Sequence, residues 1–195
     1  MSEHHDHSHA VVTEENSKKL MVALGLTTTF LIVEVVAAFI TQSLALLSDA
    51  AHMFTDVAAL AIALAAIKIG KKAADDKRTF GYQRFEILAA LFNAVMLFVV
   101  AIYIVYEAYQ RFTNPAEIQS VGMMIVAVIG LVINLISMKI LSASAEGSLN
   151  IKGAYLEVLS DALGSIGVII GGIVIYFTQW MWVDTVIAVL IGFWV

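Results

Sequence analysis

The stretch Ser-Asp-Ala-Ala-His-Met-Phe-Thr-Asp occupies residues 48–56 and lies inside a long apolar run. Within it, His52 and Asp56 are four residues apart, so on a helix they lie on one face with about 6 Å of rise between them. Asp49 precedes His52 by three residues and shares roughly that face. Ionisable side chains inside a hydrophobic span are costly unless they meet a partner, a cation or water. The stretch therefore predicts a membrane helix that carries a polar site.

A second acidic pair with the same spacing lies far down the chain. Glu157 and Asp161 are again four residues apart and again open an apolar run. We expect the two pairs to face each other across a helix interface and to hold one divalent metal ion by four ligands: His52, Asp56, Glu157 and Asp161. Zn²⁺ accepts both imidazole and carboxylate ligands, at about 2.0–2.2 Å. The alternative is a structural cluster of hydrogen bonds, but three carboxylates without Lys or Arg at that depth would need a cation or protons.

Three more polar residues lie within predicted membrane spans and leave several interpretations open. Asp49 is interpreted as a further ligand, a proton carrier or a helix-packing residue. Glu34 is interpreted either as part of a proton path or as a neutral, hydrogen-bonded side chain. Asn134 is interpreted as forming a hydrogen bond between helices. The alternative is that it belongs to a secondary site or a proton path.

The N-terminal segment, residues 1–19, is polar and is expected to be a disordered tail. Four histidines alternate there with acidic and hydroxyl residues: His4, His5, His7 and His9. Such tracts bind Zn²⁺ loosely. The tail is interpreted as a weak metal-collecting segment, or as a segment without a required role.

Composition indicates the class of protein. The 195 residues are 61% hydrophobic and only 14% charged, whereas soluble domains average about 45–50% apolar and about 25% charged residues. The chain is therefore expected to be an all-α, polytopic membrane protein in the lipid bilayer. Without cysteine it has no disulfide framework or thiolate metal site, and without a basic stripe it has no predicted nucleic-acid partner.

Residues 20–195 are expected to form one transmembrane domain of six spans. The spans are predicted at residues 21–40, 44–69, 85–112, 121–141, 153–177 and 182–195. The last is too short to cross and is expected to belong to a longer native helix. Ten of the eleven Lys and Arg residues fall on one side, which predicts that this side is cytoplasmic, with both termini inside. The ten are Lys18, Lys19, Lys68, Lys71, Lys72, Lys77, Arg78, Arg84, Lys139 and Lys152.

Small residues mark the two spans that carry the ionisable pairs. The span at 44–69 is rich in alanine, and the span at 153–177 contains Gly164, Gly167, Gly171 and Gly172. Because close packing drives the association of membrane helices, small residues let such helices approach each other. The two spans are therefore expected to touch, running antiparallel.

Three long strings resemble the cation diffusion facilitator family, and in particular its bacterial cobalt–zinc–cadmium resistance branch. They are residues 44–56, 78–93 and 149–161. The resemblance implies metal–proton antiport, a homodimer and six spans in the bacterial inner membrane. It also implies that the transport site contains His52, Asp56 and Asp161.

Two departures from the family pattern affect what the resemblance implies. Glu157 stands where many zinc members have histidine, which predicts a broader preference among Zn²⁺, Co²⁺ and Cd²⁺. The cytoplasmic domain that the family usually adds after its sixth span is absent from this sequence, so dimer stability and metal regulation are not predicted.

The function predicted from these observations is that of a secondary transporter, not an enzyme, which exports divalent transition metal in exchange for protons. Metal ligands must be deprotonated to bind, so one site can exchange metal for protons. A divalent-cation channel is one alternative, although Mg²⁺ prefers oxygen ligands and water, and His52 would be out of place. A non-transporting membrane subunit is another. The protease motifs HExxH and GxSxG are absent.

Overall fold

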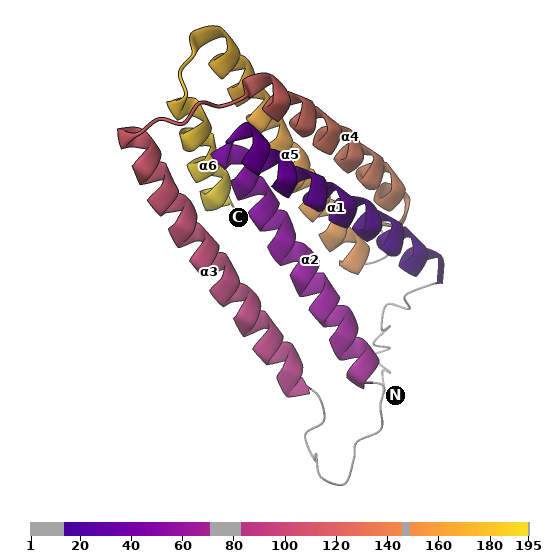
Figure 1. Cartoon of the computed structure of the whole chain (residues 1–195). Coiled ribbons are helices and arrows are strands. Elements are labelled where there is room, and N and C mark those ends of the chain that lie inside the picture. The colour runs from indigo at the N-terminus through magenta and orange to yellow at the C-terminus, as the bar shows by residue number, and fades with distance from the viewer. Residues whose placement is uncertain (1–13, 71–82, 146–148, 195) are drawn as a thin grey trace, which may run out of the picture.

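The computed structural model describes residues 14–70, 83–145 and 149–194, and in these ranges it contains helices and short connections but no strand (Figure 1). The helices are α1 (Glu14–Thr41), α2 (Leu44–Gly70), α3 (Gln83–Thr113), α4 (Ser120–Ala145), α5 (Leu149–Thr178) and α6 (Trp182–Trp194). The predicted all-helical class is confirmed. The last five helices match their predicted spans closely, because long apolar runs determine them.

The first helix begins earlier than the sequence predicted. Helix α1 begins at Glu14, inside the tail that was expected to be disordered. Residues 14–19, which the sequence analysis assigned to the tail, thus belong to α1 in the structure. The histidines of the tail, His4, His5, His7 and His9, lie outside the described residues.

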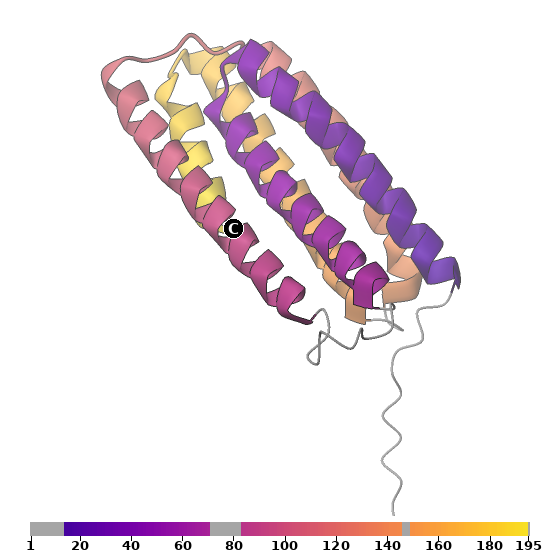
Figure 2. The ribbon, with the colours of Figure 1, turned by 60° about the horizontal axis from the view of Figure 1, so that its bottom comes forward.

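Successive helices run in alternating directions along the bundle (Figures 1 and 2). The connections from α1 to α2, from α3 to α4 and from α5 to α6 all lie at one end, which we call the short-turn end. Helices α2 and α5 therefore run antiparallel, as predicted. This arrangement brings the middle of α5 beside α2, with the two helices running in opposite directions.

A two-residue turn joins α1 to α2. Gln42 has a positive φ of 57°, the left-handed conformation that commonly ends a helix. Ser43 donates its backbone N–H to the carbonyl of Ala38 at 3.2 Å, which satisfies a carbonyl that the helix end leaves free. The chain thus reverses direction at once, and Ser43 stands directly before the first residue of α2.

Four helices contain apolar segments long enough to cross a bilayer, judged on the described residues. The segments are Met21–Thr41, Ala94–Thr113, Ser120–Ser142 and Ile151–Thr178. Helix α6 is apolar but shorter, with 13 residues. Large apolar side chains on the bundle surface are exposed, among them Phe98 on α3 and Phe177 on α5. A chain with this surface is a multi-pass membrane protein, because lipid covers such side chains without cost.

The helices pack in a connected order. Helix α4 packs along α5 and α1, whereas α2 packs along α1, α3 and α6 and contacts α5 over a shorter stretch. Glycine permits one of the closest approaches, since a Cβ atom on Gly130 of α4 would overlap the ring of Phe30 on α1. The predicted contact between α2 and α5 is confirmed, and it lies where their ionisable residues are.

Candidate metal centre

Helix α2 places His52 and Asp56 on one face, as their spacing predicted. His52 Nε2 lies 3.4 Å from Asp56 Oδ2. Two ligand atoms that are each about 2.0–2.1 Å from a tetrahedral ion lie roughly 3.4 Å apart. The pair is therefore spaced as two ligands of one ion would be.

Helix α5 adds a third group from the opposite side. Asp161 Oδ1 lies 3.6 Å from His52 Nε2, and one ligand atom each from His52, Asp56 and Asp161 lie within 4.8 Å of one another. Asp161 is 4% exposed, and its Oδ1 atom has no hydrogen-bond partner in the described part of the chain. A buried polar atom without a partner is costly. The position of Asp161 Oδ1 is therefore suitable for an oxygen atom that binds a cation.

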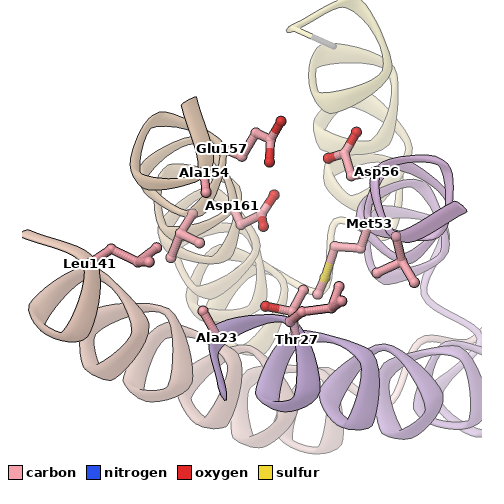
Figure 3. Close-up of a pocket in the computed structure, with 11 residues that line it drawn as sticks. Ala23, Thr27, Met53, Asp56, Leu141, Ala154, Glu157 and Asp161 are labelled. Carbon is pink, nitrogen blue, oxygen red and sulfur yellow. The ribbon is translucent and has the colours of Figure 1, made fainter. Parts of the chain in front are cut away.

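Glu157 lies one turn before Asp161 on the same helix but outside this group of three. Its side chain is exposed, and Figure 3 shows its carboxylate pointing toward the space beside Asp56 and Asp161. All three carboxylates line one cavity of about 50 Å³. The structure thus brings three of the four predicted ligands together and places Glu157 at the rim of their cavity.

The cavity lies in the half of the bundle away from the short-turn end. Its other walls come from α1, through Ala23 and Thr27, and from Leu141 near the end of α4 (Figure 3). Of the three clustered residues, Asp56 and Asp161 line this cavity.

A second cavity reaches the cluster from the side of α6. It has a volume of about 290 Å³, and its walls include Asp49, His52, Ser160, Gly164 and Trp194. Trp194 Nε1 donates a hydrogen bond to Ser160 Oγ at 2.6 Å, directly before Asp161 in the chain. The sequence did not indicate this cavity, because it depends on how α6 packs against α2 and α5.

The remaining predicted polar residues are all buried. Glu34 and Asp49 are 1% and 2% exposed, and their carboxyl groups lie near each other. Asn134 is equally buried, but its side-chain atoms have no hydrogen-bond partner among the described residues. The hydrogen bond between helices that was expected for Asn134 is therefore not formed in this structure.

The sequence analysis missed a buried carboxylate, Asp184 at the start of α6. It is fully buried and accepts hydrogen bonds from the backbone N–H groups of Leu44 at 2.6 Å and Ala45 at 3.2 Å. Arg111 Nη1 lies 3.5 Å from it and donates to the carbonyl of Gln42 at 2.6 Å. The signal was present, because an ionisable residue within an apolar segment marks a specific interaction.

The chain is similar in sequence to known proteins over nearly its whole length. A family model for the cation efflux transmembrane domain matches residues 20–195. The chain is 64% identical to the metal cation efflux system protein CzcD of Cupriavidus metallidurans, over 98% of this chain and 60% of that protein. It is 44% identical to a cadmium, cobalt and zinc/H⁺–K⁺ antiporter of Bacillus velezensis, over 96% of this chain and 60% of that protein.

A third relative, the zinc transporter ZitB of Escherichia coli, is 42% identical over 96% of this chain and 61% of that protein. The chain thus spans about 60% of the length of the curated relatives it matches. The match covers all six helices, including both helices that supply the clustered His and Asp residues.

Proposed function

Because the chain belongs to the cation efflux transmembrane domain family, we propose that it exports divalent transition-metal ions from the cytoplasm in exchange for protons. Zn²⁺ is the first substrate in this proposal, with Co²⁺ and Cd²⁺ as further substrates. The named relatives support this order, since one is a zinc transporter and another a cadmium, cobalt and zinc antiporter.

The observation that carries the proposal is the cluster of His52, Asp56 and Asp161, whose ligand atoms lie within 4.8 Å of one another. An imidazole and carboxylates in a four-coordinate arrangement suit Zn²⁺. In our proposal Glu157 supplies the fourth ligand by turning inward from the rim of the cavity. The ion is bound at the contact of α2 and α5, so a change in the packing of these helices alters its access.

The proposed topology has six spans, with α6 as part of the sixth and both termini on the cytoplasmic side. The distribution of Lys and Arg supports this orientation, since Arg111 alone falls near the short-turn end. The cavity at Asp56 and Glu157 then opens toward the cytoplasm, from which metal enters. We further propose a homodimer in the bacterial inner membrane, as the family resemblance implies, and a weak metal-collecting role for the N-terminal histidines.

The exchange follows from the charge of the site. Three carboxylates close together repel one another when no cation is present, so the empty site favours protons. A divalent ion offsets this repulsion and displaces protons from its ligands. Metal and protons therefore occupy the site in alternation, which is the requirement for antiport.

The test is metal uptake into inside-out vesicles, with and without an acidic interior. Zn²⁺, Co²⁺, Cd²⁺ and Mn²⁺ are compared for the unaltered chain, for Asp161→Asn and for Glu117→Gln, which makes the same chemical change at an exposed carboxylate outside the cavity. We expect saturable, gradient-dependent uptake that Asp161→Asn abolishes and Glu117→Gln leaves intact. Uptake that neither saturates nor depends on the proton gradient would indicate a channel.

A further inference from the structure

The larger cavity leads from the metal cluster toward the short-turn end. His52 lies in its wall, and from there the wall on α5 continues to Gly167 and the wall on α6 continues to Ile187. Because α5 runs toward the short-turn end and α6 runs away from it (Figure 1), these two residues are the wall positions nearest that end. The cavity therefore extends from the metal ligands toward the side that the proposed topology assigns to the exterior.

The lining of this cavity restricts where a released ion can go. Beyond Asp49, His52 and Ser160, the walls consist of apolar or aromatic side chains and glycine, so they offer no further carboxylate or imidazole ligands. At the lateral edge, Leu163 and Leu190 are 49% and 62% exposed on the lipid-facing surface. An ion does not enter hydrocarbon without a large cost. The route from this cavity to water therefore runs along the helices to the short-turn end.

An apolar contact between α5 and α6 closes that route. Gly171 lies one turn beyond Gly167, and a Cβ atom at Gly171 would overlap Ile187 Cδ1 and lie 3.6 Å from Ile187 Cγ1. The side chain of Ile187 thus reaches the backbone of α5 because residue 171 is glycine. Ile187 also packs against the buried apolar cluster that includes Leu44 and Ile175 at the short-turn end. An apolar constriction of this kind excludes water and ions while it is closed.

The two sides of α6 are held differently near the short-turn end. On the side of α2, Ser48 Oγ donates a hydrogen bond to the carbonyl of Ala188 at 3.0 Å, and Asp184 accepts the backbone N–H groups that begin α2. On the side of α5, Ile187 meets Gly171 in a van der Waals contact, which is weak for each pair of atoms. The contact between α5 and α6 is therefore the one that separates more easily at this end.

We propose that Ile187 is the exit gate of the transporter. Seated on Gly171 it closes the larger cavity, and the ion leaves toward the short-turn end when α5 and α6 separate there. This inference rests on the proposed transport function and its orientation. Protons reach the clustered ligands through the same opening, which agrees with the exchange of metal and protons at one site.

The first experiment locks the gate with a disulfide, which is possible because the chain contains no cysteine of its own. Gly171→Cys combined with Ile187→Cys joins α5 to α6 across the gate. The control combines Gly172→Cys with Met124→Cys, which joins the adjacent residue of α5 to α4, since a Cβ atom at Gly172 would overlap the Met124 side chain. Zinc uptake into inside-out vesicles is measured before oxidation, after a thiol oxidant and after a phosphine reductant. Loss of maleimide labelling reports the cross-link, and competition with a fluorescent chelator reports zinc binding.

We expect the cross-link between residues 171 and 187 to lower zinc uptake by about tenfold or more, reversibly, because the exit cannot open. Zinc binding should remain, since no ligand is altered. The cross-link between residues 124 and 172 should leave uptake within about twofold of the reduced protein, because it joins helices that already pack along each other. Normal uptake with the gate cross-linked would overturn the inference, as would equal loss in both pairs or loss of zinc binding.

A second measurement decides the matter if a cysteine pair does not fold or cross-link. Gly167→Cys places a single thiol in the cavity wall, where a Cβ atom meets nothing within 4 Å. We expect Ile187→Ala to speed its labelling by a membrane-impermeant thiol reagent, added at the short-turn side, by about tenfold, because the constriction is wider. Met124→Ala, the control, should not change the rate. An unchanged rate in Ile187→Ala would refute the gate, whereas absence of zinc uptake by the unaltered chain would refute the proposed function.

Discussion

Asp184 accepts a hydrogen bond of 2.6 Å from the hydroxyl group of Ser43, across 141 positions of the sequence. The same hydroxyl oxygen accepts the backbone N–H of Leu46 at 3.1 Å, so Ser43 caps α2 directly and Asp184 caps it from α6. Helix N-termini leave N–H groups free, and these favour a negative charge. One buried carboxylate therefore connects α6 to the helix that carries His52.

Removing this carboxylate should destabilise the protein. We expect Asp184→Ala to lower the free energy of unfolding by about 3–5 kcal/mol, because it leaves buried donors and a nearby arginine without their acceptor. Asp184→Asn should lower the free energy of unfolding by less, since its amide oxygen still accepts hydrogen bonds. The measurement is the thermal unfolding midpoint in detergent, with Glu117→Ala as an exposed control. A midpoint unchanged in Asp184→Ala would show that the cap does not stabilise the fold.

The identity of residue 157 should set the choice of metal. We expect Glu157→His to keep Zn²⁺ transport, because imidazole suits zinc, and to discriminate more sharply against Mn²⁺, which prefers oxygen. Asp161→Ala should abolish transport of every metal and weaken zinc binding by more than tenfold, about 1.4 kcal/mol. Vesicle uptake of Zn²⁺ and Mn²⁺ checks both variants. The four-ligand site is refuted if Glu157→His is as inactive toward zinc as Asp161→Ala.

The contact between α2 and α5 should tolerate no side chain at Gly164. A Cβ atom there would lie 2.8 Å from Asp49 Oδ1, and the Asp49 side chain is buried. We expect Gly164→Leu to reduce metal transport severalfold without altering a ligand, since overpacking typically costs about 1–3 kcal/mol. Gly167→Ala is the control on the same helix, because a Cβ atom at Gly167 meets nothing within 4 Å. Equal zinc uptake in both variants would contradict this prediction.

Deleting residues 1–10 should reduce transport only modestly, by about twofold or less, because loose metal binding by a histidine-rich tract adds little to a complete site in the membrane. The measurement is zinc uptake at low and at saturating metal concentrations. We expect any loss to appear at low concentration alone. Complete loss of uptake, in a variant that inserts normally, would assign the tail an essential role.

The four predicted ligands differ in how far the sequence alone specifies their positions. His52 and Asp56 were predictable as a pair, because their relation depends only on the pitch of one helix. Asp161 was predictable as their partner from its matching pair and from the small residues that let α5 approach. Glu157 stays a predicted fourth ligand, since it lines the same cavity as Asp56 and Asp161 but lies outside the group of three.

The sequence by itself determined the helices, the membrane class and the residue types of the metal centre, because apolar run length and helical periodicity are local properties. Only the tertiary structure decided which polar groups of different helices meet. Glu34 meets Asp49 from another helix, and Asp184 meets Ser43 across most of the chain. Such pairings depend on the relative depth and rotation of packed helices, which no spacing within one helix specifies.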